Sequence, residues 1–489
     1  MKKIISASLF AVTMLGLTNC ARNPVTGKSQ VVLMSEAQEI AMGDEADPQI
    51  IAQYGLYEDS ALQRYFNLKG QELARVSHRP NLVYHFRVLD SDVVNAFAVP
   101  GGYVYFTRGI MGHLNDEAQF TGVLGHEIGH VAARHSVAQQ RNALLGQLGI
   151  LAGVVINPNL ARFAESASQG LQLMLLKFGR DAERQADELG VEYSSKLKYD
   201  AHHMADFFIT LERQRPEGSE ELPDFLSTHP NPGDRNVTVN QLATDWQKKL
   251  NLTNPAVNRN AFLKHIDGVI YGEDPRGGYK EGNMFYHPVL KFQFATPADW
   301  MYQNSPQQVQ FAPKDGKALM FMTLAKGNTL QEASNGFLQQ NNMRVVESQN
   351  TTVNGLPAIA VVADPQPAAD QQQQQQQQQT EQLRTLSYFI QYNGSIYLLM
   401  GVTSLANFNS YADTFSRTME SFRQLTDPAK LNKKPERIRL RTVNQTTTLQ
   451  AALTSLGTPQ ARLNELSIVN GMQLTDQVPA GTMIKIFGQ

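Results

Sequence analysis

The sequence "GHEIGHVAARH", residues 125–135, places three histidines and one glutamate within eleven positions. The preceding "DEAQFTGVL" has apolar residues at helical spacing, so the motif is predicted to lie within a helix. Residues four apart share a helix face, so His126 and His130 can present two imidazoles to one Zn²⁺ ion. Glu127 lies one position round, where it can act as general base on a zinc-bound water. Gly129 is expected to leave room beside the metal.

A hydrolytic zinc site needs a third protein ligand and an open fourth position. His135 is five residues beyond His130, which on one straight helix turns it about 140° away. It is therefore predicted to be structural rather than a ligand. The better candidate is "FGRDAERQADELGVEY", residues 178–193, where Glu183 can complete a His₂Glu set. Asp187, one turn further, can orient a ligand imidazole or pair with an arginine. The alternative is an ordinary solvated, charged helix.

The combination of "HEIGH" with "RDAERQAD" about fifty residues later resembles the gluzincin endopeptidases of the HtpX and BepA type. Three further segments are similar to that family: "VNAFAVPGGYVYFTRGIM" (94–111), "LSTHPNPGDR" (226–235) and "KYDAHHM" (198–204), where Ala201 replaces a proline. The resemblance covers about residues 30–290. It implies a zinc-dependent endopeptidase with ligands His126, His130 and Glu183.

The resemblance also places His229 on a loop near the cleft. Its imidazole would either stabilise the oxyanion of the reaction or occupy the open zinc position and hold the enzyme latent. The plain alternative is a surface histidine before a proline turn. Arg235 is expected either to bind substrate carbonyls or to fix the loop by pairing with an acid.

The segment "AVPGGYVYF", residues 98–106, reads as a sharp turn followed by an exposed β-strand. A substrate peptide could add to such an edge through main-chain hydrogen bonds. A simple hairpin in a mixed sheet is the alternative interpretation. The predicted substrate-binding residues are Ala98, Pro100, Gly101 and Gly102.

The composition limits the remaining functions. A formal net charge of -2 argues against a nucleic-acid partner, and the single cysteine, Cys20, excludes an intrachain disulfide and a thiolate metal cage. Residues 1–19 have a basic start and a short apolar run, as in a secretory signal. Their end resembles a lipobox, which implies that Cys20 is acylated and attaches the protein to a membrane. An ordinary signal peptide with an incidental cysteine is the alternative. The expected location is the outer membrane, facing the periplasm.

The predicted fold class is α+β, in several domains. Residues 20–260 form a mainly helical zincin domain with a small β-sheet, and 261–283 form a connecting helix and linker. Residues 284–425 read as an α+β domain that resembles PsbP-like modules, with nine glutamines (371–379) in a loop. A linker, 426–436, leads to a β-α-α-β module, 437–489, which resembles LysM modules. A docking domain without a glycan ligand is the alternative.

The expected function is cleavage of misfolded or misassembled envelope proteins, which would be the substrates and partners of the enzyme. One alternative is a chaperone-like or scaffolding protein whose protease site is latent or dispensable. Another is a cell-wall enzyme that contacts peptidoglycan through residues 437–489. The apolar runs 143–156 and 171–178 are too short to span a bilayer, and are either buried helices or a movable lid over the zinc.

Overall fold

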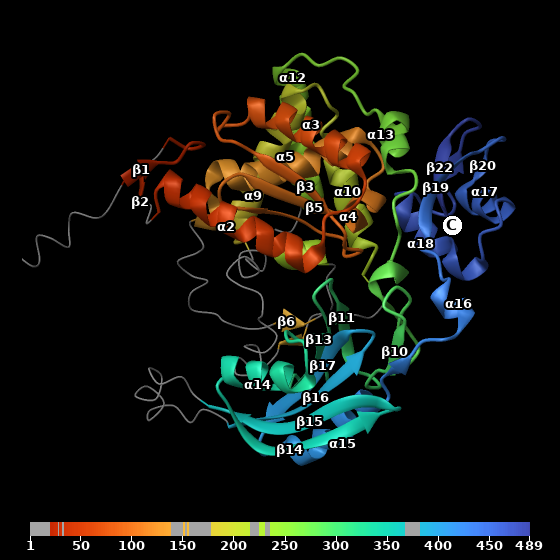
Figure 1. The fold of residues 1–489 in the computed structure, drawn as a ribbon. Helices are drawn as coiled ribbons and strands as arrows, with labels where there is room; N and C mark the ends of the chain where they lie inside the picture. The colour runs from red at the N-terminus through yellow and green to blue at the C-terminus, as the bar shows by residue number, and fades with distance from the viewer. Residues whose placement is uncertain are drawn as a thin grey trace, which may run out of the picture.

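The computed structural model describes residues 20–27, 29–31, 34–137, 150–151, 154–155, 178–215, 224–229, 235–366 and 382–489. The predicted signal segment, the glutamine tract and most of the two apolar runs lie outside these residues. Figure 1 shows a helical domain, a second domain built on a large sheet, and a small terminal module beside the helical domain. The predicted α+β fold class is confirmed. Within the described residues, no helix combines the length and the apolar character that a bilayer crossing requires.

Helix α5 (Glu117–Ala133) lies at the centre of the helical domain, and every residue in it is buried. It begins at an Asp116 cap, whose carboxylate accepts a hydrogen bond from the Gln119 amide. Around it pack α3 (Ser60–Val76), α9 (Arg180–Lys196), α10 (His202–Glu212) and α13 (Arg259–Ile266). A helix buried on all sides places every polar side chain that it carries in the interior.

Glycines let α5 and α9 approach closely. A Cβ atom added at Gly125 would lie 3.1 Å from the Gly190 Cα, and one at Gly129 would lie 3.0 Å from the Leu189 Cβ. The expectation that Gly129 leaves room beside the metal is therefore wrong: the space at Gly129 is taken by α9. The consequence for the site is that side chains from the two helices meet across a short distance.

The small sheet of this domain has the order β3-β5-β4. β5 (Tyr103–Thr107) is paired in parallel with β3 (His85–Leu89) and antiparallel with β4 (Ala96–Val99). The prediction of an exposed strand after the turn is wrong, because β5 is central and all five of its residues are buried. The outer strands are β3 and β4, and of these β4 lies directly before the turn and packs beside α5.

The turn between β4 and β5 uses Gly101 and Gly102, whose φ angles are 86° and 93°. It packs against α2 (Glu36–Tyr54), where a Cβ atom added at Gly101 would lie 3.0 Å from the Glu39 carbonyl oxygen. Pro100 also contacts this helix, because its carbonyl oxygen lies beside Gly43. The turn is therefore part of the support for α2.

The second domain contains a seven-stranded antiparallel sheet of order β11-β12-β13-β17-β16-β15-β14. Its helices, α14 (Leu330–Gln340) and α15 (Phe408–Glu420), pack on separate apolar clusters. A four-stranded sheet of order β18-β10-β9-β8 adjoins it. The strand bounds are β8 Tyr279–Glu281, β9 Met284–His287, β10 Phe292–Ala295, β11 Met301–Asn304, β12 Gln308–Ala312, β13 Ala318–Leu324, β14 Met343–Val353, β15 Leu356–Pro365, β16 Leu383–Tyr392, β17 Ser395–Ser404 and β18 Arg423–Gln424.

The terminal module has the predicted order of strand, helix, helix and strand: β19 (Arg437–Thr442), α17 (Leu449–Ser455), α18 (Leu463–Val469) and β22 (Met483–Gly488). β19 and β22 pair antiparallel. Lys485 on β22 is fully buried and donates hydrogen bonds to the carbonyl oxygens of Gly112, Leu114 and Val469. Burial holds the pKa of Lys485 well below its usual range. Two of its three acceptors belong to the helical domain, so this lysine fastens the module to that domain.

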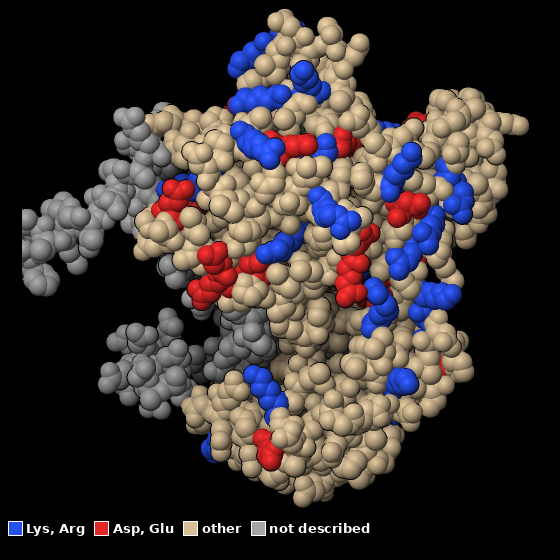
Figure 2. Space-filling model, turned by 45° about the horizontal axis from the view of Figure 1, so that its top comes forward, with Lys and Arg blue, Asp and Glu red and all other residues tan. Residues whose placement is uncertain are grey.

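The surface carries charges of both signs. In the face shown in Figure 2, basic and acidic side chains are interspersed over the helical domain and its neighbours. This pattern accords with a net charge of only -2.

Candidate metal centre

Helix α5 supplies two imidazoles to a buried group of polar side chains. The Nε2 atoms of His126 and His130 lie 3.0 Å apart, and both side chains are only 1% exposed. The predicted spacing of four residues therefore brings both rings to one side of the helix.

Glu183, in the first turn of α9, meets this pair. Its Oε1 lies 3.4 Å from His130 Nε2, and its Oε2 lies 3.6 Å from His126 Nε2. The short separation of α5 and α9 makes this possible, because Glu183 and the two histidines come from different helices. The structure thus brings together the three ligands that the sequence predicts.

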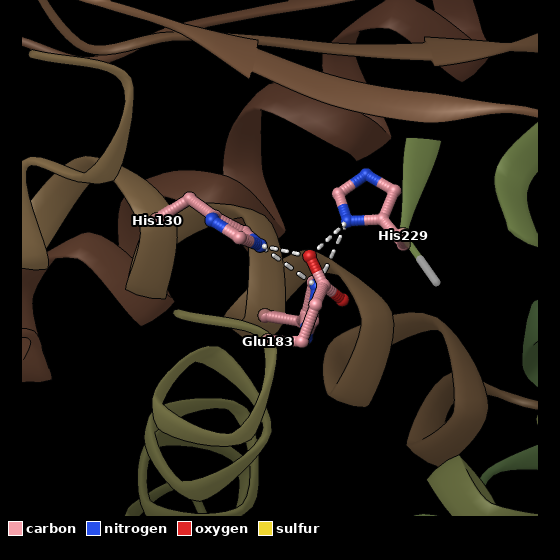
Figure 3. Close-up of side chains that lie close together, drawn as sticks. His130, Glu183 and His229 are labelled. Atoms are coloured by element: carbon pink, nitrogen blue, oxygen red, sulfur yellow. Dashed lines mark hydrogen bonds and ion pairs between the residues drawn. The ribbon is translucent and has the colours of Figure 1, made fainter. Parts of the chain in front are cut away.

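His229 joins the same group. It directly follows α11 (Asp224–Thr228), and its backbone amide donates to the Phe225 carbonyl. Its Nδ1 lies 3.3 Å from His126 Nε2 and 3.0 Å from Glu183 Oε1. Figure 3 shows His130, Glu183 and His229 converging on one point. His229 is fully buried, so the alternative of a surface histidine is wrong.

The donor set fits a tetrahedral zinc ion. Ligand atoms of His126, His130, Glu183 and His229 all lie within 4.8 Å of one another. Ions bound at 2.0–2.1 Å in a tetrahedron hold their ligand atoms about 3.3 Å apart. Five of the six residue pairs have atoms 3.0 to 3.6 Å apart, when both Glu183 oxygens are considered. A cation bound by both rings would account for the 3.0 Å separation of His126 Nε2 and His130 Nε2.

The protonation states of His130 and Glu183 suit metal binding. Burial lowers the pKa of His130 well below its usual range, which keeps the ring neutral. Burial alone would raise the pKa of Glu183, but the neighbouring side chains of His229, His130 and His126 outweigh it, and the pKa falls well below its usual range. Neutral imidazole and ionised carboxylate are the forms that bind metals.

Glu127 is fully buried, and neither of its carboxylate oxygens has a hydrogen-bond partner within the described part of the chain. The nearest ring nitrogen, His229 Nε2, lies 3.7 Å from Glu127 Oε1. An unpartnered buried carboxylate costs on the order of 1–3 kcal/mol or more. Burial, reinforced by Glu183 and opposed by His229 and His126, raises the pKa of Glu127. These are the surroundings of a group that exchanges protons with a reactant.

Asp187 contacts His126 at the ring nitrogen that faces away from the ligand group, and Arg235 pairs with Asp187. Asp187 Oδ1 lies 2.8 Å from His126 Nδ1, so the carboxylate accepts from that ring nitrogen and leaves Nε2 free for the metal. Arg235 donates to both oxygens of Asp187, at 2.7 and 2.8 Å, and its guanidinium lies 3.9 Å above the Phe208 ring. Of the two expected roles of Arg235, pairing with an acid is the one that the structure places here.

The predicted substrate-binding residues separate into two places. Ala98 lies in β4 beside α5, whereas Gly101 approaches the backbone of α2 and Gly102 that of Val83.

Phe178 was not singled out by the sequence, yet its ring lies 4.0 Å from that of His130 and covers it. Only its position directly before the "GRDAER" helix could have suggested this contact.

Cys20 begins β1 (Cys20–Arg22), which pairs with β2 (Ser29–Val31).

Two histidines and a glutamate on one helix, completed by a glutamate from a second helix, define the zinc metalloendopeptidase class. Residues 60–243 match the model of Peptidase family M48. Zinc is the cofactor of this domain.

The chain is similar to beta-barrel assembly-enhancing proteases. It is 31% identical to that of Yersinia pestis over 220 residues, which cover 43% of this chain and 45% of that protein. The Escherichia coli K12 protein is 29% identical over 249 residues, covering 48% and 51% of the two chains. The human mitochondrial metalloendopeptidase OMA1 is 27% identical over 239 residues, 45% of each chain. The chain thus matches about half the length of these relatives.

One solved structure that is similar in part is the cyanobacterial PsbP of Synechocystis, at 9% identity and a TM-score of 0.22, covering 30% of this chain and 96% of that one. The resemblance of residues 284–425 to PsbP-like modules stays a prediction.

Proposed function

We propose that this protein is a zinc-dependent endopeptidase that hydrolyses peptide bonds of misfolded or misassembled proteins of the cell envelope. The observation that carries the proposal is the buried, unpartnered carboxylate of Glu127 beside the group formed by His126, His130 and Glu183. The names of the assembly-enhancing proteases support the substrate class, and the secretory pattern of residues 1–19 supports the location.

Bound zinc would supply an acidified water and polarise the scissile carbonyl. Glu127 would take the proton of the attacking water, hold it on its carboxylate, and deliver it to the leaving amine. The raised pKa of Glu127 favours acceptance of the proton and brings the carboxyl closer to neutral pH, where the proton can also be released to the amine. Asp187 and Arg235 keep the His126 ring in the orientation and tautomer that the ligand role requires.

The substrate backbone is proposed to lie along β4. Thr107 donates its amide to the Asn95 carbonyl, so Asn95 belongs to a hydrogen-bonded pair of the β4–β5 ladder. Alternation along an antiparallel ladder then turns the backbone groups of Ala96 and Ala98 away from β5. An extended peptide added there would run beside α5, the helix that carries Glu127.

Lipidated Cys20 would hold the enzyme at the outer membrane, facing the periplasm, where its substrates assemble. Contact of residues 437–489 with peptidoglycan remains a second proposed interaction of the terminal module.

The direct test of the proposal is digestion of an unfolded envelope β-barrel protein by the purified, zinc-loaded chain. We expect cleavage of the unfolded protein, no cleavage of the same protein after folding in detergent micelles, and loss of cleavage after a chelator removes zinc. Readdition of zinc should restore it. Fragments followed by mass spectrometry provide the measurement. Equal cleavage with and without the chelator would exclude the zinc mechanism.

His229 is proposed to hold the enzyme latent by occupying the fourth ligand position. Its Nδ1 lies within the ligand group, at 3.0 Å from Glu183 Oε1. We expect His229→Ala to raise kcat/KM for an unfolded substrate about 10-fold, since a position freed for water corresponds to about 1.4 kcal/mol of competing ligation. A lower kcat/KM, with zinc content unchanged, would instead assign His229 to stabilisation of the oxyanion. His203→Ala, which alters a histidine bonded to Asp116 at the far end of α5, is the matched control.

A further inference from the structure

His135 is folded back onto the ring of a metal ligand. The expectation that it continues the helix of His130 is wrong, because α5 ends at Ala133 and Arg134 adopts a left-handed conformation with φ 59° and ψ 38°. This residue ends the helix, and the His135 ring lies 4.9 Å from the His130 ring at an angle of 73°. His135 is 8% exposed. It is absent from the group of converging ligand atoms, so the conclusion that it is no ligand stands.

The two rings are joined through the nitrogens that face away from the metal position. His135 Nδ1 lies 2.9 Å from His130 Nδ1, and His135 Nε2 lies 2.9 Å from Gln185 Oε1. Gln185 belongs to α9, the helix that also carries Glu183. The result is a linear chain of hydrogen bonds from an amide oxygen, through one imidazole, to a second imidazole.

The direction of this chain decides which nitrogen of His130 can bind a metal. An amide oxygen only accepts, so His135 must carry its proton on Nε2. Its Nδ1 then has a lone pair and accepts from a proton on His130 Nδ1. With that nitrogen protonated, His130 Nε2 keeps its lone pair free, and Nε2 is the atom that lies 3.0 Å from His126 Nε2. The opposite direction of the chain would place a proton on His130 Nε2 and prevent ligation.

We propose that His135 and Gln185 are positioning residues that fix the tautomer and orientation of His130 for zinc, as Asp187 does for His126. The inference rests on the proposed zinc site and deepens it. Helix α9 would then contribute the third ligand and, through Asp187 and Gln185, support for both imidazoles of α5. The support of His126 is a carboxylate, whereas that of His130 is neutral and adds no further charge to the buried site.

Zinc affinity, measured by competition with a chromophoric chelator, tests this chain of contacts. We expect His135→Phe to raise the zinc dissociation constant about 10-fold or more, since partners of metal ligands are worth about 10–100-fold in affinity. His135→Asn should restore most of the loss, because its Oδ1 stands at the position of Nδ1 and accepts from His130. Gln185→Leu should weaken binding by a smaller factor, because it frees His135 to adopt either tautomer.

The double variant separates positioning from simple packing. If Gln185 acts through His135, then Gln185→Leu added to His135→Phe should change the dissociation constant no further. The control is Arg184→Leu on the exposed side of α9, where Arg184 pairs only with Asp181 among the contacts described for it. The absorption spectrum of the cobalt-substituted protein gives a second readout, which should shift in His135→Phe and recover in His135→Asn.

Equal dissociation constants for wild type, His135→Phe and Gln185→Leu would overturn the inference, as would fully additive losses in the double variant. If His135→Phe fails to fold, Gln185→Leu is compared with wild type instead. An unchanged zinc dissociation constant and an unchanged cobalt spectrum would then contradict the positioning role of Gln185 and His135. Wild-type protein that binds no zinc would instead refute the proposed function, so the two failures are distinguishable.

Discussion

Replacing Glu127 with glutamine is expected to lower kcat for peptide hydrolysis on the order of 10³-fold, with zinc still bound, because general acid–base catalysis contributes about 10²–10⁴-fold. The glutamine keeps the size of the side chain but cannot accept the proton of the attacking water. Glu127 is absent from the set of converging ligand atoms, so the metal should stay. Initial rates on a fluorogenic peptide and zinc content by atomic emission are the two measurements.

Glu188→Gln is a suitable control, since Glu188 is an exposed carboxylate on α9. Cleavage by the Glu127→Gln protein at the wild-type rate would refute the role of Glu127 as base. The same variant separates the enzyme from the chaperone-like alternative. Expressed in a strain that lacks the protein, Glu127→Gln should fail to restore envelope assembly if hydrolysis is the function. Full restoration would favour a role in holding clients.

Replacing Glu183 with glutamine is expected to weaken zinc binding by more than about 100-fold, which exceeds the 10–100-fold typical of residues that only support a ligand. A neutral amide is a poorer ligand than a carboxylate, and the ionised form of Glu183 is strongly favoured in the folded protein. Dissociation constants from chelator competition provide the measurement. Asp181→Asn in the same helical turn is the control, because that side chain is 99% exposed.

The Glu183→Gln substitution should also be made in the His229→Ala protein, because His229 could complete a three-histidine site when Glu183 is lost. In the His229→Ala protein, Glu183→Gln leaves only His126 and His130, and stoichiometric zinc should disappear. Zinc retained at full stoichiometry in that double variant would mean that another residue is the third ligand.

The zinc site was largely predictable from the sequence because its parts follow local geometry. A spacing of four residues puts His126 and His130 on one helix face, and the second helix with Glu183 and Asp187 has a similar periodicity. The helices and strands of the second domain and of the terminal module also follow their sequence patterns. These features depend on one element at a time, and short-range spacing is sufficient to predict them.

Other features of the site depend on how elements meet. Whether β4 or β5 is the outer strand depends on β3, which pairs in parallel from the other side. The position of Gly129 against α9 and the contact of Phe178 with His130 arise from the packing of separate segments. No spacing within "AVPGGYVYF" or "GHEIGHVAARH" contains that information.

From the amino-acid sequence, helix periodicity puts the imidazoles of His126 and His130 on one face, and the motif spacing predicts Glu127 as base and Glu183 as third ligand. The positions of His135 and His229 depend on tertiary packing. His229 enters the ligand group because its backbone follows α11 into the interior, and His135 reaches His130 because Arg134 turns the chain by a left-handed step. Periodicity describes the faces of one helix and ends with that helix, whereas these contacts depend on how each helix ends and on packing between helices.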